Sequence, residues 1–217
     1  MRSAHRRRVC LLTTPRPLIH RDTEARPTAA EMARASDILF LCLPSSVEVE
    51  AMVLGKGGVL EGAHDRLIVV DSTTADPVST RKLGEMLKAK GARMADSPLG
   101  RTPKEAEAGT LSTYIGGDPE VVAAVKPVQQ CFADTIVEVG SLGAGHTLKL
   151  INNFMSIGNC AIIAEAATTA AKMGVDMSKF HAVISAGGAN SKMFQMVAPW
   201  LLEGDDGWTL VDTGYAN

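Results

Sequence analysis

The stretch Ile38-Leu-Phe-Leu-Cys-Leu43-Pro-Ser-Ser-Val-Glu48 decides the fold of this chain. Its six consecutive apolar residues predict a strand that is covered on both faces, as strands of a parallel sheet are. Pro44 ends the strand, and Ser45 followed three residues later by Glu48 is a capping box that begins a helix. The stretch therefore predicts one strand–helix unit of an α/β protein.

The same alternation continues on both sides of this unit. A capping box at Thr28 to Glu31 predicts a short preceding helix, and Leu67-Ile-Val-Val70 predicts a second buried strand that Asp71-Ser-Thr-Thr74 ends. Asp76-Pro77 then begins another helix. Weaker strands are expected near residues 92–96, 112–115 and 135–139. Alternating strands and helices predict a parallel sheet with helices on both faces, whose ligands bind at the carboxyl ends of the strands.

After Gly145 the pattern changes to helices alone, near residues 147–173, 176–186 and 190–202. The first of these helices is mostly apolar but carries a stripe of polar residues near its start, which includes Lys149, Asn152 and Asn153. A helix that is apolar on its other faces is expected to be buried. Two interpretations of the stripe stay open: it is the wet face of the helix, or it holds a catalytic lysine with a helper amide one turn later.

A second polar segment is Ser97-Pro-Leu-Gly100-Arg101-Thr102-Pro103-Lys-Glu105. Thr102 and Glu105 form a capping box, so Arg101 stands beside a helix N-terminus, where an anion is favoured. Arg101 either binds a carboxylate, sulfonate or phosphate there or pairs with a nearby glutamate. Taken alone, Gly143 and Gly145 fit an ordinary loop, His146 fits a loop residue better than a general base, and Asp71 to Thr74 fits a cap and turn.

Composition narrows the class of protein. The 217 residues have a net charge of −2, which gives no general affinity for nucleic acid or an anionic membrane. Polar residues interrupt every apolar run before the roughly 20 residues that span a bilayer. The cysteines form no CxxC pair and the histidines have no metal-ligand spacing, so we expect no metal site and a cytoplasmic location. Cys42 and Cys160 lie in apolar runs and are expected in the core.

The first 26 residues differ from the rest of the chain. They are rich in arginine and carry prolines at positions 15 and 17. A mitochondrial presequence has a similar composition, but the two prolines would break the amphipathic helix that it needs. We therefore expect an irregular N-terminal tail over residues 1–26.

The central motifs resemble those of the β-hydroxyacid dehydrogenases. The matching pieces follow one another in family order over about residues 27–204: Leu43-Pro44, Asp71-x-Thr73-Thr74-x-x-Pro77, Asp96-Ser-Pro-Leu-Gly100, Ala108-Gly-Thr-Leu111, Gly116-Gly117 and Gly143-x-Gly145-x-x-x-Lys149-x-x-x-Asn153. Commoner members of the family have Ser-Gly-Gly where this chain has Gly100-Arg101-Thr102. This variant is similar to the one in family members whose arginine binds a sulfonate group. The resemblance implies an incomplete Rossmann-type parallel sheet at 27–145, a partial dinucleotide-binding domain, followed by a truncated all-α domain at 146–217 that begins with the long interdomain helix.

The resemblance also implies a reaction and the residues that carry it. The chain would transfer a hydride between NAD or NADP and a small acidic 3-hydroxy acid or aldehyde, of the 3-hydroxyisobutyrate or sulfolactaldehyde type. Lys149 would be the general acid and base, with Asn153 beside it. The residues implied for the cofactor are Leu43, Pro44, Thr74, Gly143 and Gly145, and those for the substrate are Gly100, Arg101, Thr102 and Asn152.

The chain departs from the family pattern at both ends. It contains no Gly-x-Gly-x-x-Gly turn for the cofactor pyrophosphate and no Lys-Asp motif after the helical region. A second interpretation is therefore a non-catalytic remnant that cannot hold the cofactor. An apolar sheet edge left open in this way predicts self-association, so a homo-oligomer is expected. The sequence leaves open the choice between NAD and NADP and the identity of the acid.

Overall fold

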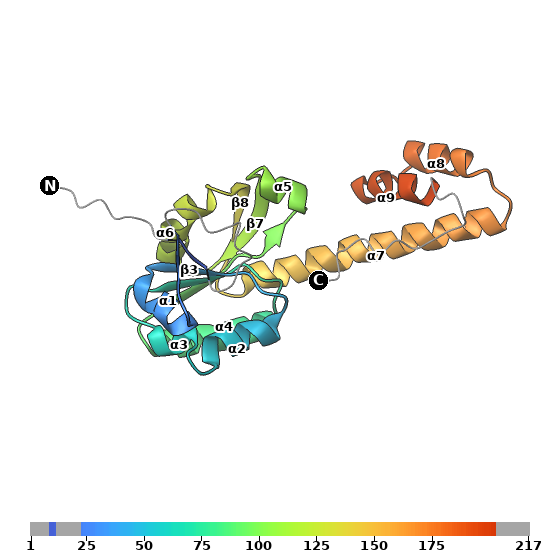
Figure 1. Ribbon diagram of the computed structural model, residues 1–217. Coiled ribbons are helices and arrows are strands. Elements are labelled where there is room, and N and C mark those ends of the chain that lie inside the picture. Colours follow the sequence, from blue (N-terminus) through green and yellow to red (C-terminus); the bar gives the residue numbers. More distant parts are fainter. Residues whose placement is uncertain (1–8, 12–22, 203–217) are drawn as a thin grey trace. The chain divides into compact units, whose positions relative to one another are not determined.

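The computed structural model describes residues 9–11 and 23–202 of the chain. These residues fall into two units, divided between Lys149 and Leu150, and the long helix α7 begins in the first and continues into the second. The first unit is mixed α/β and the second is helical, which confirms the predicted fold class. Figure 1 shows the elements in order along the chain.

The first unit is built on a six-stranded sheet. The strand order is β3-β4-β5-β7-β6, and β8 also pairs with β7. The three strands β3, β4 and β5 are parallel, as the two buried apolar runs predicted. The bounds are β3 Ile38–Leu41, β4 Ile68–Asp71, β5 Arg93–Asp96, β6 Leu99–Gly100, β7 Leu111–Gly116 and β8 Ala133–Gly140.

The sheet is not parallel throughout, which the sequence did not predict. β7 runs antiparallel to both β5 and β6, whereas β7 and β8 are parallel. The reason lies in the segment between β5 and β7, which holds only the two-residue β6 and the five-residue α5 (Pro103–Glu107). A parallel return usually runs through a helix long enough to cross one face of the sheet, and the five-residue α5 is too short for that, so the chain returns antiparallel.

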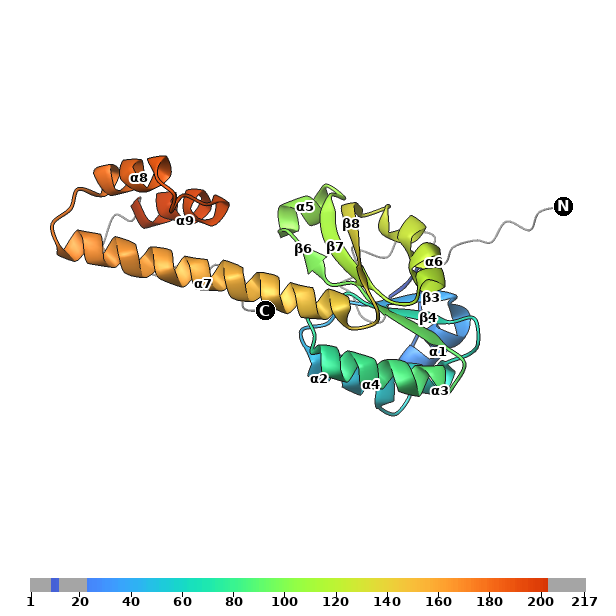
Figure 2. The same cartoon turned by 180° about the vertical axis from the view of Figure 1, so that it is seen from behind.

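Helices cover both faces of the sheet, as expected for buried parallel strands (Figure 2). Leu39, Leu41 and Val69 point to one face, where they pack with residues of four helices. Ile68 and Val70 point to the other face, against valines of α6. The bounds are α1 Ala29–Ala35, α2 Ser46–Leu54, α3 Val59–Gly62, α4 Pro77–Lys88 and α6 Pro119–Gln129.

The predicted caps begin the predicted helices. Thr28 accepts a hydrogen bond from Glu31 N at 3.2 Å, and Ser45 accepts one from Val47 N at 3.2 Å. Asp76 accepts one from Val78 N at 2.8 Å, at the start of α4. Each cap satisfies one of the free N–H groups of its helix. The four-residue helix α3 was not predicted, because so short a segment has no apolar periodicity.

Two short strands lie in the segment that was expected to be irregular. β1 (Val9–Leu11) and β2 (Thr23–Ala25) form a separate parallel pair, with Val9 opposite Thr23. Three-residue strands are too short to show an alternating pattern, so the sequence did not reveal them. The rest of the predicted tail, apart from Arg26, lies outside the described residues.

The second unit consists of α7 (Ala144–Lys172) from Leu150 onward, α8 (Met177–Ala186) and α9 (Lys192–Leu202). Phe194 of α9 is buried and stacks on His181 of α8 with ring centroids 5.5 Å apart. Met193 contacts Cys160 of α7 at 3.2 Å between the two sulfur atoms. The helical region follows the three predicted segments closely.

The expectation that α7 is a buried helix is wrong for the described residues. Phe154 is 79% exposed and Ile162 is 68% exposed, because nothing in the described chain covers these faces. By length and composition alone, α7 meets the criterion for a helix that crosses a membrane, although the sequence argued against a span. This is weak evidence, since the core helix of a soluble protein meets the same criterion.

Candidate functional site

The loops that follow β3 and β4 meet at the carboxyl edge of the sheet. Leu43 is half-buried there, and Pro44 and Thr74 are exposed. The hydroxyl of Thr73 accepts a hydrogen bond from Leu43 N at 3.0 Å, which ties the two loops together. Three of the five residues predicted to bind the cofactor therefore lie on two joined loops at the edge where open α/β sheets bind ligands.

Cys42, which lies beside these loops, is not in the core. Cys42 is exposed and Cys160 is half-buried, so both core assignments are wrong. Cys42 follows the last residue of β3 instead of lying within the strand, and Cys160 lies on α7, whose faces are open.

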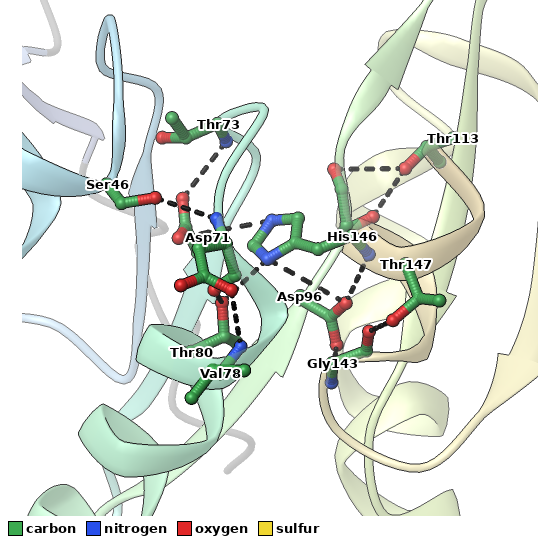
Figure 3. Close-up of polar contacts among 12 residues, drawn as sticks. Ser46, Asp71, Thr73, Val78, Thr80, Asp96, Thr113, Gly143, His146 and Thr147 are labelled. Atoms are coloured by element: carbon green, nitrogen blue, oxygen red, sulfur yellow. Dashed lines mark hydrogen bonds and ion pairs between the residues drawn. The ribbon is translucent and has the colours of Figure 1, made fainter. Parts of the chain in front are cut away.

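Asp96, the last residue of β5, holds the beginning of α7. Its Oδ1 accepts a hydrogen bond from Gly143 N at 2.6 Å, and its Oδ2 accepts one from His146 N at 2.7 Å. Burial raises the pKa of the Asp96 carboxyl, and the two N–H donors oppose that rise. The carboxylate thus satisfies two N–H groups at the start of the helix and fixes α7 to the sheet (Figure 3).

The two glycines before Lys149 allow this close approach. Gly143 has φ of +90°, which favours glycine. A Cβ on Gly145 would lie 2.2 Å from the carbonyl oxygen of Tyr114 and 2.9 Å from Oδ2 of Asp96. Both glycines are buried, Gly145 against β5 and β7 and Gly143 against α4, so packing of the start of α7 accounts for them without a ligand.

His146 is a buried helix residue, and its assignment to a loop is wrong. Its side chain is 0% exposed, and its Nδ1 lies 2.7 Å from the hydroxyl of Thr80 in α4. The carboxylates of Asp71 and Asp96 each lie 4.0 Å from a ring nitrogen. One signal in the sequence points to this cluster: Asp71 and Asp96 each end a predicted strand, and the carboxyl ends of parallel strands lie at the same edge of a sheet.

Lys149 lies one turn after His146 in α7 and is half-buried. Burial lowers the pKa of its ammonium group, and no ion pair within the described chain offsets that effect. Asn153, one turn further along α7, is half-buried, whereas Asn152 is exposed. Lys149 is therefore not a fully solvated residue of a wet helix face, because part of its side chain is removed from water.

Arg101 is paired with an aspartate and not with the glutamate that the sequence offered as its alternative partner. Its guanidinium donates to Asp134 Oδ2 at 2.8 Å and to Thr135 Oγ1 at 3.1 Å, and also contacts the carbonyl of Thr110. The Arg101 hydrogen bond lowers the pKa of the Asp134 carboxyl. Arg101 has φ of +76°, a backbone conformation that normally favours glycine.

The neighbours of Arg101 have local structural roles as well. Thr102 and Glu105 form the predicted capping box, with Thr102 N donating to Glu105 Oε2 at 3.0 Å. A Cβ on Gly100 would lie 2.5 Å from the hydroxyl of Ser112 on the neighbouring strand, so a larger residue there requires the Ser112 side chain to rotate away. The segment is thus a well-defined turn that presents one arginine.

Comparison with known proteins gives the family. A model of the NAD binding domain of 6-phosphogluconate dehydrogenase matches residues 12–140, and a model of the NAD-binding domain of NADP-dependent 3-hydroxyisobutyrate dehydrogenase matches residues 143–206. The 2-(hydroxymethyl)glutarate dehydrogenase of Eubacterium barkeri is 32% identical over 81% of this chain and 58% of its own length. The 3-sulfolactaldehyde reductase of Escherichia coli K12 is 37% identical over 67% of this chain and 50% of its own length.

A solved structure agrees with these matches. The 3-hydroxyisobutyrate dehydrogenase of Mycobacterium tuberculosis, with L-serine, superposes with a TM-score of 0.75 at 26% identity, over 82% of this chain and 60% of that one. The chain spans between half and three fifths of the length of these relatives. Both the matched models and the similar sequences place the described motifs in one group of proteins, and the chain belongs to the β-hydroxyacid dehydrogenase family.

Proposed function

We propose that this chain carries the substrate-facing part of an NAD(P)-dependent oxidoreductase, which interconverts a small acidic 3-hydroxy acid and its aldehyde. The observation that carries the proposal is Lys149, a half-buried lysine with a lowered pKa that lies next to the sheet-anchored start of α7. A lysine whose pKa lies closer to neutral exchanges protons more effectively in catalysis. The substrates named for the related enzymes, sulfolactaldehyde and 3-hydroxyisobutyrate among them, support an acidic substrate.

The cofactor is proposed to be NAD or NADP, held by Leu43, Pro44 and Thr74. A half-buried leucine and two exposed residues on joined loops fit a flat ring that rests on the carboxyl edge of the sheet. Gly143 and Gly145 fit direct contact less well, because both are buried and Gly143 N already donates to Asp96. Their proposed contribution is to hold α7 against the sheet. A bound nicotinamide supplies or accepts the hydride.

In this proposal Lys149 handles the proton of the reaction. It donates a proton to the aldehyde oxygen as that oxygen becomes a hydroxyl, and in the opposite direction it accepts the hydroxyl proton. Asn153 lies one helical turn later on α7 and holds the lysine or the substrate hydroxyl by a hydrogen bond. Asn152 is proposed as a further substrate contact.

The acid group of the substrate is proposed to bind at Gly100, Arg101 and Thr102. Arg101 would then exchange part of its pairing with Asp134 for the substrate anion, since a guanidinium offers five donors. We expect Arg101→Ala to raise KM for the acidic aldehyde by about tenfold, with a smaller change in kcat, because one charge-assisted contact is lost. Steady-state kinetics with NADH measures both constants.

Two variants control this experiment. Arg101→Lys keeps the charge without the planar fork, so we expect a smaller rise in KM. Asp134→Ala releases the guanidinium from its ion pair, so we expect KM to fall. If KM is the same in Arg101→Ala and the parent chain, the arginine serves only its ion pair with Asp134.

A second candidate function is a family member that does not hold the cofactor by itself. It is favoured by one observation, the lack of a Gly-x-Gly-x-x-Gly turn anywhere in the 217 residues. The pyrophosphate contacts of that turn contribute several charge-assisted hydrogen bonds, and losing them weakens binding by several kcal/mol. If this second candidate is right, calorimetric titration of this chain with NADH gives a Kd far above the micromolar range. Micromolar binding would rule out this second candidate.

Several broader expectations stay predictions for this chain. They are the division into a cofactor-binding part at 27–145 and a helical part at 146–217, a homo-oligomeric state, a cytoplasmic location, and the lack of a metal, nucleic-acid or membrane partner.

A further inference from the structure

The ring of His146 leaves one hydrogen bond unmade in a fully buried site. Among the described residues, His146 Nε2 and Asp71 Oδ2 are both buried polar atoms without a hydrogen-bond partner. These two atoms face each other at 4.0 Å, about 1 Å longer than a hydrogen bond (Figure 3). A buried polar group without a partner is costly, so the pair requires an explanation.

The protons available around the ring explain why the bond is unmade. The hydroxyl of Thr80 donates to the carbonyl oxygen of Asp76 at 3.0 Å. A hydroxyl has one proton, so the 2.7 Å contact between Thr80 Oγ1 and His146 Nδ1 requires the ring nitrogen to donate. A neutral ring that carries its proton on Nδ1 has a bare Nε2. Two acceptors, Nε2 and Asp71 Oδ2, therefore face each other, and a second proton on the ring would join them.

Two carboxylates face the ring from neighbouring strands. Asp71 faces it from β4 and Asp96 from β5. Both oxygens of Asp96 already accept backbone hydrogen bonds, whereas Asp71 uses only Oδ1, which accepts from Thr73 N at 3.0 Å. The cations near this helix end are Lys149 of the same helix and Arg81 of α4, whose side chain lies beside Gly143.

We propose that His146 is a positioning residue, and that a second proton on its ring makes Nε2 donate to Asp71 Oδ2. The bond would tie the first turn of α7 to the loop after β4. Thr73 in that loop also holds Leu43 N, and Lys149 follows His146 by three residues. One proton on a buried ring thus sets how closely the start of α7 approaches the loops at the sheet edge. The consequence for Lys149 rests on the function proposed above, but the bond itself does not.

Nitrogen-15 NMR of the histidine rings tests the bond in the full chain without any ligand. We expect the His146 signals at alkaline pH to show the proton on Nδ1, and at acid pH to show both nitrogens protonated with a slowly exchanging Nε2–H. His64 is an internal reference of the opposite tautomer, because its Nδ1 accepts from Arg66 N at 3.3 Å and its Nε2 contacts the carbonyl of Ala33 at 3.1 Å. A His146 ring with its proton on Nε2 at alkaline pH would overturn the proposal.

Two substitutions at Thr80 probe the same proton arrangement without removing the ring. Thr80→Ser keeps the hydroxyl, so we expect the proton to stay on Nδ1. Thr80→Val has nearly the same shape but gives Nδ1 nothing to donate to, so we expect the neutral ring to move its proton to Nε2 and to bond Asp71 at all pH values. An unchanged tautomer in Thr80→Val contradicts the role assigned to Thr80.

Two substitutions at His146 link the bond to the proposed function. Gln carries an amide N–H near the position of Nε2, and Asn carries one near the position of Nδ1. We expect the Kd of the parent chain for NADH to tighten by about tenfold as the pH falls and the bond forms. The expected Kd of His146→Gln stays at the tight end and that of His146→Asn at the weak end, both without pH dependence.

The two arms of the test fail separately. If the NMR signals are as expected but no variant binds NADH, the bond stands and the proposed function falls. The opposite outcome has two parts: NADH binds with the same pH dependence in all three chains, and the His146 ring of the parent chain carries its proton on Nε2. In that case the positioning role falls and the proposed function survives.

Discussion

Replacing Lys149 by alanine should lower turnover by about 100-fold or more, because proton transfer by a placed side chain contributes 10²- to 10⁴-fold. The residue follows the turn that Asp96 holds to the sheet, and burial already lowers its pKa. Steady-state reduction of an acidic aldehyde with NADH measures the effect. Lys172 is the matched control, since it is an exposed lysine at the other end of the same helix and Lys172→Ala should leave turnover unchanged.

The pH profile of the parent chain adds a second readout for Lys149. Reduction needs the protonated lysine, so its rate falls as the pH rises through the lysine pKa. Because burial lowers that pKa, the fall should begin at a lower pH than an ordinary lysine gives. Oxidation needs the neutral amine and should instead speed up over the same range. Equal turnover in Lys149→Ala and the parent chain, or a profile that Lys149→Ala does not alter, would remove the proposed mechanism.

Replacing Gly145 by alanine should destabilise the fold by about 3 kcal/mol or more, since added atoms in a packed site force backbone shifts. The new methyl group would lie 2.2 Å from the carbonyl oxygen of Tyr114 and 2.9 Å from Oδ2 of Asp96. The first neighbour is backbone and cannot rotate away. Relieving the contact would move the start of α7 off Asp96 and break the bonds to Gly143 N and His146 N. Urea unfolding followed by circular dichroism measures the change.

Gly158→Ala is the control for this experiment. Gly158 lies in the same helix, and a Cβ there meets nothing within 4 Å. Alanine is the better helix former by up to about 1 kcal/mol, so Gly158→Ala should stabilise the chain slightly. If both alanine variants unfold at the same urea concentration as the parent chain, Gly145 does not mediate the packing described here.

Much of the fold was predictable from the sequence, because its signals are local. Continuous apolar runs at Ile38 to Leu43 and Leu67 to Val70 gave the first two strands of the parallel sheet, and Thr28, Ser45 and Asp76 gave the helix starts. The antiparallel β7 was not predictable from these signals, because strand direction depends on how the short segment after Asp96 returns to the sheet.

The candidate site divides in the same way. The sequence motif singled out Lys149, and the structure adds that the lysine is half-buried and without an ion pair in the described chain. The sequence also offered Arg101 as either an anion-binding residue or a partner of a glutamate. It did not reveal Asp134, which lies 33 residues away in the chain. The burial of His146 between Asp71 and Asp96 was equally hidden, since its partners come from three different elements.

The sequence by itself determined which segments become strands and helices, where the helices begin, and the family motifs at Lys149, because each depends on neighbours within a few residues. Only the tertiary structure decided that Asp96 anchors α7, that Gly145 allows close contact with Tyr114, and that His146 and Asp71 face each other across an unmade bond. These contacts join residues about 30 to 75 positions apart in the chain. Folding of the sheet alone brings them within reach, and no local pattern records their distances.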